Sequence, residues 1–231
     1  MQVDIGTEFI ILSGIMTIIL SLTLSTFLGW KWYKQKVRLM TDLPLVFAIC
    51  GIFQVLNMTI LTLSHIGVLE PTMELFRLRS MVICGAIVPI LGTILQIWTP
   101  SYQKYHKRVV ILLTLYWFSI ALIGTSEAII MILTIPILLI ISIVMMITFI
   151  VTWKTGRLKE IRSELMIVSV FFMVASQILR VPFMSTPLFY VPDVFLAVSM
   201  ILIALGIANP WYAREKKASH EEPPQMVPIT E

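Results

Sequence analysis

Seven long apolar stretches follow one another along the chain, and they limit its fold more than any other feature. Each is close to the roughly 20 apolar residues that a helix needs to cross a membrane. They lie at Phe9–Trp30, Leu43–Ile66, Met73–Trp98, Val109–Thr125, Ala128–Trp153, Leu165–Val181 and Val194–Asn209. Unbroken apolar runs of this length favour helices over the alternating strands of a membrane barrel. The sequence therefore predicts seven membrane-spanning helices.

The composition leaves room for little else. Hydrophobic residues make up 58% of the 231 positions and charged residues only 13%, whereas soluble domains have about 45–50% apolar residues. One soluble core of this size cannot bury such an excess. We expect an all-α, polytopic membrane protein, with a seven-helix domain at 1–209. A short cytoplasmic tail at 210–231 is proline-rich and polar, which predicts disorder.

The positive charges predict the orientation of the bundle. Of the 17 basic residues, only Arg77, Arg79 and Arg180 fall on one side of the predicted membrane, and the others follow the odd-numbered stretches or lie in the tail. The positive-inside rule then places the N-terminus outside and the C-terminus in the cytoplasm. The sequence predicts a multi-pass protein of the cell membrane. Its basic rim suits contact with anionic lipid rather than with nucleic acid.

Charged residues near the predicted outer ends of the helices form a candidate charge cluster or ligand pocket. They are Glu74, Arg77, Glu127, Arg180 and Asp193. The apolar run before Arg180 covers about 21 Å of a roughly 30 Å hydrocarbon core, so Arg180 lies below the headgroups. A charge there costs about 2.5–3.5 kcal/mol, so we expect Arg180 to pair with Asp193 or Glu127. The cluster is either a structural lock or a ligand pocket roofed by the proline-rich loop 181–192.

Polar residues in the second and third stretches suggest further interactions. Arg77 and Arg79 are about 200° apart around their helix, so they cannot face the same pocket, and both can snorkel to the membrane boundary. Glu74 and Arg77 have the spacing of a local ion pair. Gln54 and Asn57 lie near one face of the second helix, where they either form interhelical hydrogen bonds or line a path for a ligand or ion.

The first stretch carries small residues at a strict four-residue spacing. These are Ser13, Thr17, Ser21, Ser25 and Gly29. A stripe of this kind lets another helix approach closely in lipid. It indicates helix packing, either within the chain or between the subunits of an oligomer.

Several classes of active site are absent from the sequence. All the lysines fall in predicted cytoplasmic loops or the tail, which excludes a retinal Schiff base inside the bundle. The histidines, His65, His106 and His220, are too scattered for paired haem ligands. No metal-ligand cluster, phosphate-binding loop or catalytic triad is present. We expect no enzyme activity, no cofactor and no metal site.

The region Leu43–Leu112 resembles the corresponding part of the seven-helix sensory input regions found at the N-termini of some histidine kinases. The resemblance rests on the polar second stretch, Glu70-Pro71, Leu75-Phe76-Arg77, Gly85-Ala86 and Pro89. It implies the same orientation and a sensory role. Only a short tail follows Asn209, so a signal would leave through the basic loops or the tail to a separate partner protein.

Three functions follow from these features. The first is a receptor-like or sensor-like protein that signals through a separate partner. The second is a non-catalytic accessory subunit of a larger membrane complex, a homo- or hetero-oligomer. The third is a small-solute transporter, in which Pro89 and Pro136 mark broken helices around a site at the midplane.

Overall fold

The computed structural model describes residues 5–36, 38–156, 161–183 and 186–210. Its helices are α1 (Ile5–Tyr33), α2 (Leu43–Ile66), α3 (Met73–Trp98), α4 (Gln103–Ile123), α5 (Glu127–Thr155), α6 (Ser163–Phe183) and α7 (Val191–Ala208), with short 3-10 helices η1 (Pro100–Tyr102) and η2 (Pro187–Tyr190). Among the described residues, seven segments are long and apolar enough to cross a membrane. The predicted all-α, multi-pass bundle is thus confirmed, whereas the predicted tail lies outside the described residues after Pro210.

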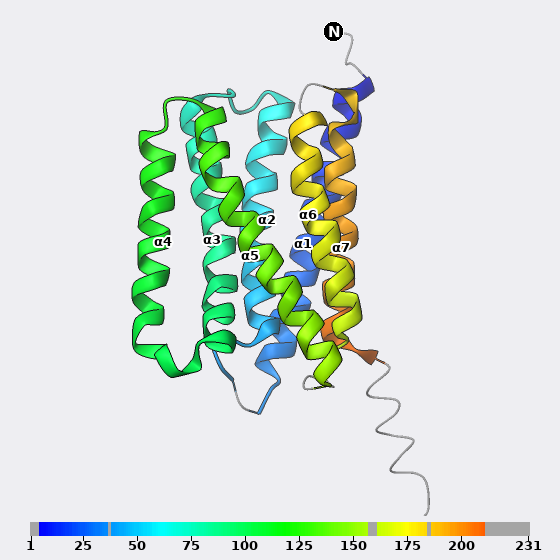
Figure 1. Cartoon of the computed structure of the whole chain (residues 1–231). Helices are drawn as coiled ribbons and strands as arrows, with labels where there is room; N and C mark the ends of the chain where they lie inside the picture. The colour runs from blue at the N-terminus through cyan, green and yellow to red at the C-terminus, as the bar shows by residue number, and fades with distance from the viewer. Residues whose placement is uncertain (1–4, 37, 157–160, 184–185, 211–231) are drawn as a thin grey trace, which may run out of the picture.

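The helices form one bundle in which α4 stands at an edge (Figure 1). We call the end where α1 begins, drawn at the top, the upper end, and the opposite end the lower end. Helix α1 packs against α2 and α7, and α6 packs against α7. Helix α5 crosses the bundle diagonally, from α3 and α4 at the upper end toward α6 at the lower end (Figure 1). The described basic residues other than Arg77, Arg79 and Arg180 lie at the lower end.

Helices α2 and α3 have the limits predicted from the sequence, because their ends carry clear local signals. Pro44 occupies the first turn of α2, where its missing N–H is not needed. Gly67 ends α2 in the left-handed conformation, with φ of 84°, which a glycine adopts without steric cost. Thr72 caps α3 by accepting a hydrogen bond from the Leu75 N–H at 3.3 Å.

The segment between the last two predicted spans differs from the expected loop. Helix α6 continues through Pro182 to Phe183, η2 follows, and α7 already begins at Val191. Pro192 lies in the first turn of α7, where proline is compatible with a helix. The expectation that this segment is a loop is therefore wrong for most of its described residues. The prolines begin or end helices here.

The small-residue stripe of α1 faces the interior of the bundle. Thr17, Ser21 and Ser25 are buried, and Ser13 and Gly29 are partly buried. Across from the stripe lie α2 and α7. The Ser21 hydroxyl, for example, is 3.2 Å from the sulfur of Met200 on α7. The stripe thus packs α1 against its neighbours in the same chain.

Glycines on α1 and α2 allow the closest approach between these helices. Gly14 faces Thr62, and Gly51 faces Ser25. A Cβ atom at Gly51 would lie 3.3 Å from the Ser25 Cβ and 3.5 Å from the Ser21 carbonyl oxygen, with the Ser25 hydroxyl closer still. The contact therefore depends on the absence of a side chain.

We expect Gly51→Ala to lower the free energy of unfolding by about 1–3 kcal/mol, the usual cost of overpacking. Thermal unfolding of the purified protein in a mild detergent measures the loss. The matched control is Gly92→Ala in the interior of α3, where nothing lies within 4 Å of the added Cβ. That variant should be neutral or more stable, because alanine favours a helix by about 0.5–1 kcal/mol. Equal stability of the two variants would refute the close packing.

Helix α4 has few buried side chains to hold it in the bundle. Within α4 only Trp117 and Ala121 are buried. The Trp117 indole N–H lies 2.9 Å from the Ser80 carbonyl oxygen and 3.1 Å from the Ser80 hydroxyl on α3. This contact joins the edge helix to the rest of the fold.

Candidate functional site

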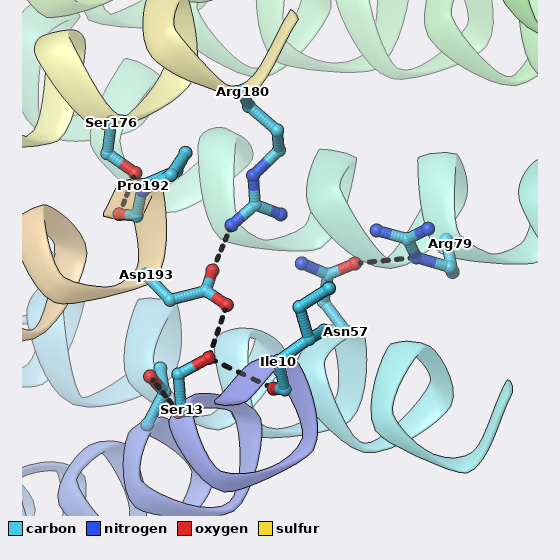
Figure 2. A network of polar contacts seen from close by, with 9 residues as sticks. Ile10, Ser13, Asn57, Arg79, Ser176, Arg180, Pro192 and Asp193 are labelled. Atoms are coloured by element: carbon cyan, nitrogen blue, oxygen red, sulfur yellow. Dashed lines mark hydrogen bonds and ion pairs between the residues drawn. The ribbon is translucent and has the colours of Figure 1, made fainter. Parts of the chain in front are cut away.

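An ion pair between a partly buried arginine and a buried aspartate links three helices at the upper end of the bundle (Figure 2). The Arg180 guanidinium of α6 donates to the Asp193 carboxylate of α7 at 2.5 Å. The Ser13 hydroxyl of α1 lies 3.3 Å from the other carboxylate oxygen and 3.0 Å from the Ile10 carbonyl oxygen. Asp193 is one of the two partners that the sequence predicts for Arg180. The pair joins α6, α7 and α1.

Local structure places Asp193 where a carboxylate is favoured. Asp193 lies in the first turn of α7, where unpaired N–H groups and the helix dipole stabilise negative charge. The Ser176 hydroxyl of α6 donates to the Pro192 carbonyl oxygen at 2.7 Å. Further down, the Ser199 hydroxyl donates to the Ser169 carbonyl oxygen at 2.8 Å. These hydrogen bonds hold α7 against α6 in one register.

The other members of the predicted charge cluster lie apart from this pair. Arg77 donates to the Gly124 carbonyl oxygen at 3.1 Å, at the turn between α4 and α5. Glu127 begins α5 close to that turn, and Glu74 is exposed. Within the described residues Glu74 and Arg77 form no ion pair, contrary to their spacing, because Arg77 turns toward Gly124. The structure therefore brings together Arg180 and Asp193 but not the whole cluster.

Arg79 points into the bundle, contrary to the expectation that it snorkels to the boundary. Its Nε–H donates to the Asn57 side-chain oxygen of α2 at 3.3 Å, and Figure 2 shows this contact beside the Arg180–Asp193 pair. It also interacts electrostatically with Arg180, Glu127 and Asp193. The inward direction has a physical reason: Asn57 offers Arg79 a polar partner inside the bundle.

A cavity of about 260 Å³, which we call the central chamber, lies between the helices. All seven helices contribute to its lining, and α4 does so through Trp117. Arg79, Arg180, Asn57 and Gln177 line its upper part. Apolar side chains line most of the remainder, including Leu28, Phe47, Ile83, Ile90, Leu138 and Ile203. The chamber thus combines a charged upper part with an apolar lower part.

Further polar side chains lie in the wall of the chamber. They include Gln54 of α2, Ser25 of α1, Thr134 and Ser142 of α5 and Ser199 of α7. Thr17 and Ser21 donate to backbone carbonyl oxygens one turn earlier in α1, but the buried Ser25 hydroxyl has no hydrogen-bond partner in the described part of the chain. A buried hydroxyl without a partner costs free energy.

Sequence reasoning found part of this site. The shared face of Gln54 and Asn57 predicted either interhelical hydrogen bonds or a polar lining. Both residues line the chamber, and Asn57 also accepts an interhelical hydrogen bond from Arg79. The sequence did not predict that Arg79 points into the bundle. The one feature that could have indicated it is that Arg77 and Arg79 lie on opposite faces of their helix, so that only one of them can face outward. Trp117 was also missed, because nothing in the apolar sequence of α4 distinguishes it from a boundary tryptophan.

Comparison with known proteins adds no family. No protein-family model, no curated protein and no solved structure matches this chain. The resemblance of Leu43–Leu112 to sensory regions of histidine kinases stays a prediction from the sequence. In the described part of the chain, no group of three or more His, Cys, Asp or Glu residues is placed to hold a metal ion.

Proposed function

We propose that this protein is a receptor-like membrane protein whose ligand occupies the central chamber and whose signal passes to a separate partner at the lower end. The observation that carries the proposal is that the chamber is lined by all seven helices. A ligand that binds one arrangement of these helices better than another shifts the population toward it. A single occupant can thus change the arrangement of every helix.

Arg180 connects the chamber to the helix contacts. It lines the chamber and also forms the ion pair that joins α6 to α7 and, through Ser13, to α1. A ligand near Arg180 would therefore act directly on the contact among three helices. By the positive-inside rule, the basic lower end is cytoplasmic, which is where we propose that a partner protein binds.

The proposal is tested by filling part of the chamber with a larger side chain in place of a ligand. Ala86 lines the chamber, so Ala86→Phe places a ring inside it. Cys50 and Cys84 are first replaced by alanine. Spin labels are then attached to cysteines introduced by Lys36→Cys and Lys104→Cys, and they report the distance between two parts of the lower end. We expect Ala86→Phe to shift the distance distribution, because the helices must adjust around the new side chain.

Leu115→Phe is the matched control, since Leu115 of α4 is 57% exposed and faces away from the chamber. It should leave the distances unchanged. An unchanged distribution in Ala86→Phe, in a protein that remains folded, would contradict the receptor proposal.

A transporter is the second candidate, because the chamber extends into the middle of the bundle. Against it, α3 and α5 continue as single helices through Pro89 and Pro136, and transporter sites are typically formed by broken helices. Solute uptake by proteoliposomes that contain the purified protein would favour transport. A stable stoichiometric complex, isolated in gentle detergent and identified by mass spectrometry, would instead favour the accessory-subunit alternative.

A further inference from the structure

We propose that the central chamber binds an amphiphilic anion, with a carboxylate head at Arg79 and a single alkyl tail in the apolar lower part. This inference rests on the proposed function, because it names the class of ligand that the chamber takes. It is carried by the charges of the lining, by the hydrogen bonds of Arg79 and by the shape and polarity of the chamber.

The charges in the lining favour an anion. Two guanidinium groups, those of Arg79 and Arg180, line the chamber, and no carboxylate is among the described lining residues. Asp193 forms the ion pair with Arg180. Arg79 forms no ion pair in the described part of the chain, because the carboxylates of Glu127 and Asp193 interact with it only from beyond ion-pair distance. Its hydrogen-bond partner is the neutral side chain of Asn57. A cation among apolar helices is costly unless a negative charge contacts it directly, and an anionic ligand would supply that contact.

The geometry of Arg79 leaves donors for such a head group. Its Nε–H bonds to Asn57, so the terminal nitrogen atoms are the groups that can reach a ligand. A carboxylate accepts two parallel hydrogen bonds from a guanidinium, and charge-assisted bonds of this kind are roughly twice as strong as neutral ones. Asn57 holds the Arg79 side chain in place.

The apolar part of the chamber suits one alkyl chain. The separation of Arg79 and Ile90 along α3 is about 16 Å at ~1.5 Å per residue, and both residues line the chamber. Its 260 Å³ lies just below the roughly 300–1,000 Å³ of typical small-molecule pockets. A single chain of medium length fits these dimensions, whereas a two-chain phospholipid is too large.

The experiment measures ligand binding to the full chain in nanodiscs of zwitterionic phosphatidylcholine, because detergent tails would compete for the chamber. Radiolabelled dodecanoate is the probe, with dodecanol, dodecylamine and butyrate as competitors. We expect saturable binding of one dodecanoate per chain. Dodecanol should compete about tenfold or more weakly, the effect of losing a charge-assisted hydrogen bond. Dodecylamine, whose head group is a cation at neutral pH, and butyrate, which lacks the long tail, should not compete.

Substitutions then locate the head group. Arg79→Gln should weaken dodecanoate binding about tenfold or more, for the same reason, and should leave dodecanol binding unchanged, which also shows that the chamber is intact. The matched control is Arg77→Gln, two positions away on the same helix, because Arg77 contacts Gly124 and does not line the chamber. Its affinity for dodecanoate should match that of the unsubstituted protein.

Three results would overturn the proposal: equal affinities for dodecanoate and dodecanol, an Arg79→Gln variant that binds dodecanoate normally, or displacement of dodecanoate by inorganic phosphate. Phosphate displacement would indicate a site for a free anion. The spin-label experiment with Ala86→Phe does not depend on any of these results. If Ala86→Phe shifts the spin-label distances but dodecanoate binding fails these tests, the receptor proposal stands and the amphiphilic anion is rejected as its ligand.

Discussion

Asp193→Asn should lower the free energy of unfolding by about 3–5 kcal/mol, the usual cost of removing one partner from a buried ion pair. The Asp193 side chain is 1% exposed and lies 2.5 Å from the Arg180 guanidinium. Asparagine keeps the shape of the side chain but not its charge, so the Arg180 cation loses its carboxylate partner inside the bundle. The Ser13 hydroxyl also loses a charged acceptor.

Chemical or thermal unfolding in a mild detergent measures this loss. Glu164→Gln is the control, because Glu164 pairs with Arg162 at 3.5 Å with side chains that are 53% and 42% exposed. Exposed pairs contribute about 0–1 kcal/mol, so this control should be nearly neutral. Arg180→Gln should destabilise the protein too, and the double variant should recover part of the loss, because it leaves no uncompensated charge. Wild-type stability in both single variants would contradict the role of the pair.

The sequence predicted those parts of the structure that depend on local signals or on the cost of charge. Pro44, Gly67 and Thr72 mark the ends of α2 and α3, and the predicted limits of these helices are correct. Arg180 needed a partner because its position in the apolar segment is costly, and Asp193 was one of two candidates. The helix ends require only local sequence signals, and the partner of Arg180 requires only sequence distance and the thickness of the membrane.

Which face of each helix points into the bundle could not be predicted in the same way. In a soluble helix the apolar face points inward, but in lipid the outer surface is as apolar as the interior. Trp117 and Tyr116 are adjacent aromatic residues, yet one is buried and the other exposed. Arg79 likewise required the structure, because its separation from Arg77 shows that the two differ in direction but not which one faces inward. The chamber follows from these directions, so most of its lining was not predictable beyond the polar face of Gln54 and Asn57.

Trp117→Ala should have the second large effect, a loss of about 3–5 kcal/mol, as is typical when a buried aromatic side chain leaves a cavity. Trp117 is 1% exposed, and its hydrogen bonds to Ser80 join α4 to α3. Because α4 buries little else, this loss should loosen α4 before the rest of the bundle. Protease accessibility of the turns that flank α4, measured alongside unfolding, would detect such local loosening.

Two further variants separate the causes of this effect. Tyr116→Ala removes a neighbouring side chain that is 46% exposed and should be nearly neutral. Trp117→Phe retains most of the apolar volume and should lose about 1 kcal/mol, the usual contribution of a hydrogen bond. If Trp117→Ala were as stable as Tyr116→Ala, the anchoring role of Trp117 would be wrong.

Because Trp117 also lines the central chamber, its truncation lengthens or widens the apolar part of the chamber. The affinity for hexadecanoate should then rise relative to that for dodecanoate, which would connect the packing of α4 to the choice of ligand.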